Sequence, residues 1–168
     1  RLLPGHHLVV KDGQVAVTQY WDLRFPDRPM QGSEDEIAHR LVALLKDSVR
    51  EHMIADVPVG VLLSGGVDST AMLSFAVEET QQTIKTFTVG FSEPGVTDER
   101  PYARIAARRY GSEHHEMTVS AQDFLAFLPR YVRHMEEPVC EPPAVALYYV
   151  TELARRHVKV LLSGEGGD

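Results

Sequence analysis

The sequence predicts an α/β fold: a doubly wound, mostly parallel sheet with flanking helices, preceded by a short β-hairpin. Short apolar runs typical of buried strands alternate with helical segments along most of the chain. Such alternation favours parallel strands that are joined by helical crossovers. The first and the last strand of this alternating region each run into a Gly-rich turn.

Composition narrows the class of protein. The 168 residues contain 17 Lys and Arg against 24 Asp and Glu, which gives a net charge of −7. This acidic balance argues against a general nucleic-acid or membrane-surface binder. No apolar run reaches the roughly 18 residues of a membrane span. Cys140 is the single cysteine, so an internal disulfide and a CxxC metal site are excluded, and we expect a reducing, cytoplasmic setting.

The first 30 residues differ from the rest. Asp12-Gly13 lies between two apolar runs and predicts a hairpin, because such turns need residues that accept a positive φ. An extended segment and a Pro-containing linker follow. Ser33 and Glu36 then form a predicted capping box, which begins a helix that extends to Met53.

The alternating region begins after that helix. Apolar, β-branched and aromatic runs mark its strands. Cap residues, glycine or proline mark the ends of its helices. The predicted elements are strand 57–63, helix 67–79, strand 84–91, helix 98–110, strand 115–119, helix 121–134, a loop and helix from 142 to 156, and strand 158–162.

Residues 64–70 carry the most informative chemistry. A buried strand runs into Ser64-Gly65-Gly66 and then into a helix, whose free N–H groups attract anions. Asp68 would repel phosphate unless Mg²⁺ lay between them. A Walker A loop is excluded because the chain has no Gly-Lys pair, and the G-x-G-x-x-G dinucleotide loop is also missing. The alternative is a tight strand-to-helix turn without a ligand.

The run Ser64-Gly65-Gly66-Val67-Asp68-Ser69 matches the S-G-G-x-D-S PP-loop of the N-type ATP pyrophosphatases. More narrowly, the chain resembles the synthetase domain of class B, glutamine-dependent asparagine synthetases. The resemblance covers nearly the whole chain and implies an adenine nucleotide alpha hydrolase-like fold. Further similar segments are 3–6, 20–22, 56–60, 85–91, 111–116 and 162–168.

The resemblance implies ATP-dependent amide synthesis. Aspartate and ATP would give aspartyl-AMP and pyrophosphate, and ammonia from glutamine would then give asparagine. The implied cofactors and partners are ATP, Mg²⁺, L-aspartate or another carboxylate, and ammonia, without nucleic acid or membrane. A homodimer is compatible with the longer protein.

The family's site residues transfer to matching positions. Glu165 would be catalytic, by orienting the intermediate and taking a proton from ammonia. For Glu165 and Asp168, the alternative is a solvated turn. The ATP and AMP contacts would be Leu63, Val89, Ser163 and Gly164. The pyrophosphate contacts would be Ser64, Gly65, Gly66, Asp68 and Ser69. The metal ligands would be Asp68 and Asp168.

The same resemblance predicts two domains. Residues 1–30 would be the end of an Ntn-type glutaminase domain with its linker, and residues 31–168 the N-terminal part of the synthetase domain, truncated at 168. The family's glutaminase cysteine is not in this chain, so we expect these residues alone to be inactive.

Other interpretations stay open. Glu141 and Pro143 stand where the family run has aspartate and serine, so the same adenylation chemistry could act on a different carboxylate. A nucleotide-sensing module and a tRNA-thiolating enzyme are more distant alternatives. The run His114-His115-Glu116 lacks zinc-motif spacing, and we interpret it as a strand start with structural hydrogen bonds.

Overall fold

The computed structural model describes residues 2–25, 27, 30–92, 97–136 and 143–165. The chain divides into two compact units, residues 1–38 and residues 39–168. Among the described helices, none combines the length and the apolar character that a membrane span requires.

The first unit contains the predicted hairpin. Strands β1 (His6–Lys11) and β2 (Gln14–Gln19) pair antiparallel, with Lys11 opposite Gln14. Asp12 and Gly13 join them at φ values of 50° and 75°, the left-handed conformations that a two-residue hairpin turn needs. The Asp-Gly signal therefore predicted this turn correctly.

Helix α1 (Glu34–His52) begins at the predicted capping box. The Ser33 N–H donates to the Glu36 carboxylate at 2.8 Å, and the Glu36 N–H donates to Ser33 Oγ at 3.3 Å. Along the predicted apolar stripe, Val49 is fully buried, whereas Leu41 and Leu44 are more than half exposed. The helical spacing was right, but among the described residues only part of the stripe is buried: Ile37 and Leu45 are half-buried.

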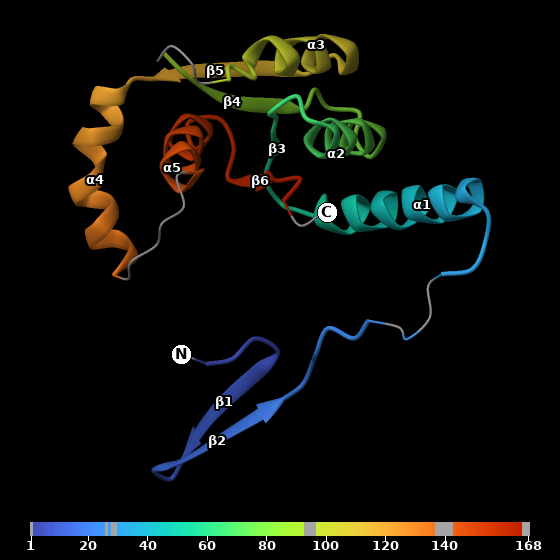
Figure 1. Ribbon diagram of the computed structural model, residues 1–168, viewed down its shortest axis with the longest axis vertical. Helices are drawn as coiled ribbons and strands as arrows, with labels where there is room; N and C mark the ends of the chain where they lie inside the picture. Colours follow the sequence, from blue (N-terminus) through green and yellow to red (C-terminus); the bar gives the residue numbers. More distant parts are fainter. Residues whose placement is uncertain (1, 26, 28–29, 93–96, 137–142, 166–168) are drawn as a thin grey trace. The chain divides into compact units, whose positions relative to one another are not determined.

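The second unit is built around a parallel sheet (Figure 1). Four strands lie in the spatial order β5-β4-β3-β6, and every neighbouring pair is parallel. The strands are β3 (Val59–Leu62), β4 (Lys85–Phe91), β5 (Glu113–Val119) and β6 (Val160–Leu162). The helices after α1 are α2 (Val67–Glu78), α3 (Arg100–Tyr110), α4 (Ala121–Met135) and α5 (Pro143–Ala154). This order confirms the predicted elements, with ends displaced by one to a few residues.

Each face of the sheet has its own core, because alternate strand residues point to opposite sides. Val61 and Leu63 pack with α1, α2 and α3 residues on one face. Phe87 packs with residues of α5 and the following turn, Val150 and Val158 among them, on the other face. Helices therefore cover both faces, and the predicted doubly wound fold is confirmed.

Candidate functional site

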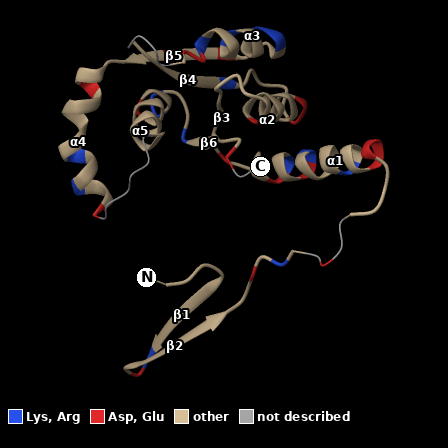
Figure 2. Cartoon of the chain, in the orientation of Figure 1, with Lys and Arg blue, Asp and Glu red and all other residues tan. Residues whose placement is uncertain are grey.

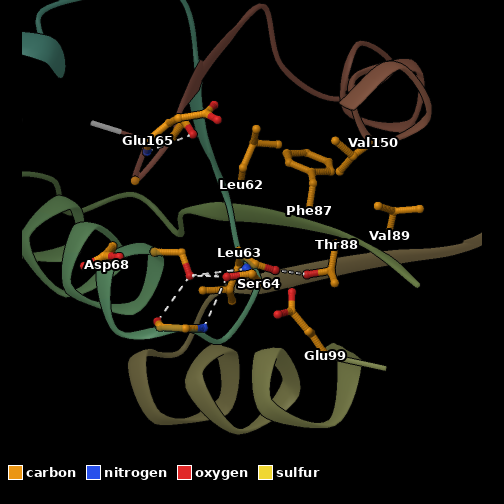
Figure 3. A pocket seen from close by; sticks show the side chains of 14 residues that line it. Leu62, Leu63, Ser64, Asp68, Phe87, Thr88, Val89, Glu99, Val150 and Glu165 are labelled. Carbon is orange, nitrogen blue, oxygen red and sulfur yellow. Dashed lines mark hydrogen bonds between the residues drawn. The ribbon is translucent and has the colours of Figure 1, made fainter. Parts of the chain in front are cut away.

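A cavity of about 380 Å³ opens beside the carboxyl ends of β3, β4 and β6 (Figure 3). Its lining residues come from these strand ends, from the first turn of α2, from the start of α3 and from α5. They are Leu62, Leu63, Ser64, Gly66, Asp68, Ser69, Phe87, Thr88, Val89, Glu99, Val150, Ser163, Gly164 and Glu165.

The strand order explains why the cavity lies here. From β3 the chain proceeds outward through β4 to β5, and then crosses back to place β6 on the other side of β3. The loops that follow β3 and β6 are therefore far apart along the chain but lie side by side in the fold. Open α/β sheets bind their ligands at such a switch point, outside the carboxyl ends of the strands.

The loop after β3 is held by its own serine side chains. The hydroxyls of Ser64 and Ser69 are 2.9 Å apart and hydrogen-bonded, and the Ser64 N–H donates to Ser69 Oγ at 3.2 Å. The Gly66 N–H donates to Ser64 Oγ at 3.2 Å. Ser69 is 8% exposed, so these bonds fix the loop before any ligand arrives.

Two glycines permit close backbone approaches around this loop. Gly65 has a φ of 82°, and a Cβ there would lie 2.5 Å from the Ala103 nitrogen of α3. A Cβ at Gly164 would lie 2.9 Å from the Ser69 nitrogen at the start of α2. Gly164 thus joins the two loops at the cavity, whereas Gly65 packs against α3 and is not among the residues that line it.

Helix α2 presents its first turn to the cavity without a side-chain cap. Gly66 is the N-cap residue and has no side chain with which to cap the first N–H groups. Asp68 is in this turn, exposed, and lines the cavity. An uncapped helix start offers hydrogen-bond donors and a partial positive charge to an anion.

Acidic groups dominate the charge of the lining. Asp68, Glu99 and Glu165 reach the cavity from α2, from the start of α3 and from the loop after β6 (Figure 3). Among the lining residues that the structure describes, none is lysine or arginine. Basic side chains instead gather along α3 (Figure 2). An anion in this cavity would therefore depend on N–H and hydroxyl donors and on a bound cation.

The start of α3 is anchored beside the cavity. Arg100 donates from Nε and Nη2 to the Asp98 carboxylate at 2.8 and 3.0 Å. The Arg100 hydrogen bonds hold the pKa of Asp98 below its ordinary value. Glu99 lies between these two residues and is thereby fixed at the cavity wall.

One wall of the cavity is apolar and rests on a buried hydrogen bond. Leu62, Phe87, Val89 and Val150 belong to the core on the α5 side of the sheet. Next to them, the Thr88 hydroxyl donates to the Leu63 carbonyl, and Thr88 is only 3% exposed. This bond ties β4 to the end of β3 where the cavity begins.

Most of the predicted site residues come together in this cavity. Glu165 is exposed there, and its N–H donates to Ser163 Oγ at 3.2 Å. Asp168 lies outside the described residues. Five lining residues, Leu62, Phe87, Thr88, Glu99 and Val150, were not predicted. The position of Phe87 and Thr88 just before Val89 was an available signal, whereas nothing in the sequence pointed to Val150.

The run His114-His115-Glu116 has structural partners. His114 Nδ1 is 2.9 Å from the Thr86 hydroxyl, and its Nε2 is 3.1 Å from the Glu116 carboxylate. Burial lowers the pKa of His114, and the Arg104 guanidinium lowers the pKa of Glu116. These hydrogen bonds agree with the strand-start interpretation.

Comparison with known proteins identifies the family. The family model described as asparagine synthase matches residues 40–168, and so covers every strand and loop of the cavity. The chain belongs to the asparagine synthase family. The matched residues include both loops that meet at Gly164.

Several curated proteins of this family are similar over the full chain. A Mycobacterium tuberculosis protein named "Putative asparagine synthetase [glutamine-hydrolyzing]" is 42% identical over 100% of this chain and 26% of its own length. Asparagine synthetase [glutamine-hydrolyzing] 1 of Bacillus subtilis is 37% identical over 98% of this chain and 26% of its own length. The chain therefore spans about a quarter of the length of these relatives.

Among solved structures, an NMN synthetase from Francisella tularensis is similar. It has a TM-score of 0.48 and 19% sequence identity, and the match covers 78% of this chain and 54% of that protein.

Proposed function

We propose that the protein containing this chain activates a carboxylate with ATP and converts it to an amide. A carboxylate oxygen attacks the α-phosphorus of ATP, the bond to the bridging oxygen breaks, and pyrophosphate leaves. Ammonia then attacks the acyl carbon, AMP leaves, and the nitrogen loses a proton. The observation that supports this most directly is the convergence of the loops after β3 and β6 on one cavity with Asp68 and Glu165 in its lining.

The two sides of the cavity match the two parts of a nucleotide. Its apolar wall, which includes Val89, would receive the adenosine, with Leu63, Ser163 and Gly164 as further AMP contacts. Its other side offers the uncapped start of α2 and the serine hydroxyls of the first loop. A volume of about 380 Å³ is within the range of small-molecule sites.

The pyrophosphate would bind where the two loops meet. Gly164 packs directly against the backbone of Asp68 and Ser69, which places the loop after β6 beside the uncapped first turn of α2. Ser64, Gly66 and Ser69 add donors, and Gly65 allows the loop to turn. Mg²⁺ would supply the positive charge that the lining lacks, and the Asp68 carboxylate is an oxygen ligand of the kind it prefers. Asp168 is the second proposed ligand.

Glu165 is the proposed catalytic residue. Its carboxylate lines the cavity next to the AMP contact residues Ser163 and Gly164. There it would orient the acyl-adenylate toward ammonia and take the proton that the attacking nitrogen loses. Correct placement and proton transfer each contribute to such a step without any covalent bond to the protein.

The names of the curated relatives, asparagine synthetase [glutamine-hydrolyzing], support a narrower proposal for the substrates. We propose L-aspartate as the carboxylate, glutamine as the source of ammonia, and the cytoplasm as the location. In this proposal residues 1–30 are the end of a glutaminase domain with its linker, and residues 31–168 are the N-terminal part of the synthetase domain. A homodimer of the whole protein is part of the same proposal.

A different carboxylate is the second candidate. Pro143 begins α5 where the family run has serine, and Glu141, which lies outside the described residues, replaces aspartate. Proline has no hydroxyl to donate to a substrate carboxylate. This change favours testing a panel of acids and not aspartate alone.

ATP–pyrophosphate exchange in the intact protein tests both candidates. Exchange that requires L-aspartate supports the first, and exchange only with another acid supports the second. ATP binding without exchange for any acid would overturn the catalytic proposal and favour a nucleotide sensor.

A further inference from the structure

A second group of metal-binding side chains lies at the amino end of the sheet. Glu113 and His115 are on β5, and His157 lies in the turn between α5 and β6. Glu113 and its partner Lys85 are the first residues of their strands, which places this group at the amino end. Glu113, His115 and His157 are not among the residues that line the cavity of Asp68 and Glu165, so the metal proposal does not rest on the function proposed for that cavity.

The strand period brings two of these side chains together. Glu113 and His115 are two residues apart on β5, so both point to the same face of the sheet. That face is covered by α5, whose last turn leads to His157. The His157 N–H donates to the Ala154 carbonyl at 2.9 Å, which fixes the turn. The rings of His115 and His157 are stacked with centroids 3.9 Å apart.

The ligand atoms are close enough to surround one ion. One atom from each of the three side chains lies within 4.8 Å of the others, and Glu113 Oε1 is 2.9 Å from His115 Nε2. Around a tetrahedral zinc with bonds of about 2.0–2.1 Å, neighbouring ligand atoms are about 3.3 Å apart. To bring all three atoms to zinc distance, the stacked rings of His115 and His157 would turn so that one nitrogen of each faces the ion.

The donor types select the class of metal. Two imidazoles and one carboxylate suit Zn²⁺ and its borderline neighbours such as Co²⁺, whereas Mg²⁺ and Ca²⁺ prefer oxygen ligands throughout. Three protein ligands would leave a fourth position for water. We propose that Glu113, His115 and His157 bind Zn²⁺ and so connect β5 to the turn that leads into β6.

Lys85 is the competitor at this site. Its ammonium is 3.7 Å from Glu113 Oε1 and balances the negative charge of that carboxylate, which would otherwise attract the metal ion. The Lys85 side chain is 31% exposed, so it can move toward solvent when a divalent ion replaces it. This arrangement gives the proposal two opposite expectations: loss of a ligand weakens binding, and loss of the lysine charge strengthens it.

The site also has a mechanical consequence. The His115 ring stacks on Phe87 with centroids 5.3 Å apart, and the His157 ring lies tilted against Phe87 with centroids 5.8 Å apart. Zinc would hold the last turn of α5 against β4 and β5 through this cluster. Because a ligand that binds only the folded state stabilises it, added Zn²⁺ raises the melting temperature.

The test uses the intact protein with Cys140→Ser, which removes a competing thiol of this chain. Zn²⁺ as the chloride is titrated by calorimetry, thermal unfolding is followed with and without Zn²⁺, and Co²⁺ absorption reports the ligand field. The variants are His157→Asn, Glu113→Gln and Lys85→Met, with His134→Asn as the control on an exposed position of α4.

We expect at least tenfold weaker Zn²⁺ binding in His157→Asn and Glu113→Gln, several-fold tighter binding in Lys85→Met, and no change in His134→Asn. Equal affinity in the parent and the His157 and Glu113 variants would overturn the proposal, as would a missing Zn²⁺-dependent rise in melting temperature. Should His157→Asn fail to fold, Glu113→Gln and Lys85→Met decide, because both side chains are partly exposed.

Discussion

Gly164 and Ser69 lie so close that no other residue fits at position 164 without displacing the start of α2. A Cβ on Gly164 would be 2.9 Å from the Ser69 nitrogen and 3.1 Å from the Asp68 carbonyl carbon. Real Cβ atoms essentially never approach a backbone nitrogen as closely as the first of these distances. The two loops of the cavity are therefore positioned against each other and not only against the sheet.

Gly164→Ala tests this contact. The added methyl group would push the loop after β6 away from the α2 N–H groups, so we expect ATP affinity to fall at least tenfold in equilibrium binding. Gly111→Ala is the control. The φ of 65° at this position is unfavourable for alanine, but a Cβ there meets nothing within 4 Å. That variant should lose stability and keep its ATP affinity. Equal ATP affinity in the parent and Gly164→Ala would refute the prediction.

Asp68→Asn tests the proposed Mg²⁺ site. The amide keeps the size of the side chain but removes the negative charge that would bind the ion, so Mg-ATP affinity should fall about ten- to a hundredfold. Without Mg²⁺ the loss should vanish or reverse, since the carboxylate of the parent then only repels phosphate. Asp47→Asn, an exposed change on α1 that loses only an ion pair with Arg50, serves as the control. An Asp68 effect of the same size in EDTA would remove this residue from the metal site.

Glu165→Gln separates catalysis from binding. The amide can still hydrogen-bond, but it neither accepts a proton nor carries charge. ATP binding should stay within about threefold of the parent, while amide formation falls by about 10²–10⁴, the usual contribution of a general base. Product formation in single turnovers is the measurement. Glu152→Gln on α5, which loses its ion pair with Arg155, should leave the rate unchanged. Normal rates in Glu165→Gln would end its catalytic assignment.

Thr88→Val tests the buried bond beneath the cavity. Valine has nearly the same shape but cannot donate to the Leu63 carbonyl, which then remains buried without that partner. The free energy of unfolding should fall by about 1–3 kcal/mol in urea titrations. Thr83→Val changes an exposed threonine and should shift stability by less than about 0.5 kcal/mol. Similar losses in both variants would mean that the Thr88 hydroxyl contributes little.

Local signals predicted the fold well, because each element carries its own boundary chemistry. The capping box at Ser33 and the Asp12-Gly13 turn formed as expected. Apolar runs located the strands, and the alternation of strands and helices predicted parallel pairing. The sequence could not say which side of β3 receives β6, since that depends on how α5 packs across the sheet.

Residues of the candidate site that belong to a sequence motif were predicted. Residues that reach the site only through packing were missed. The loops around Asp68 and Glu165 have unusual residue combinations. Val150 resembles any helix core residue, and Glu99 any exposed acid. The group of Glu113, His115 and His157 was missed for a similar reason, because two of its members come from β5 and the third from a turn more than 40 positions later.

The return of β6 to the side of β3 also sets the order of assembly. Contacts between distant parts of a chain form late, because closing a long loop costs entropy before any contact compensates it. Ser69 is in place as soon as β3 and α2 form, but its neighbour Gly164 lies 95 positions later in the chain. A half-made chain therefore carries the first loop without its partner. Acquisition of ATP affinity would then follow the pairing of β6 with β3.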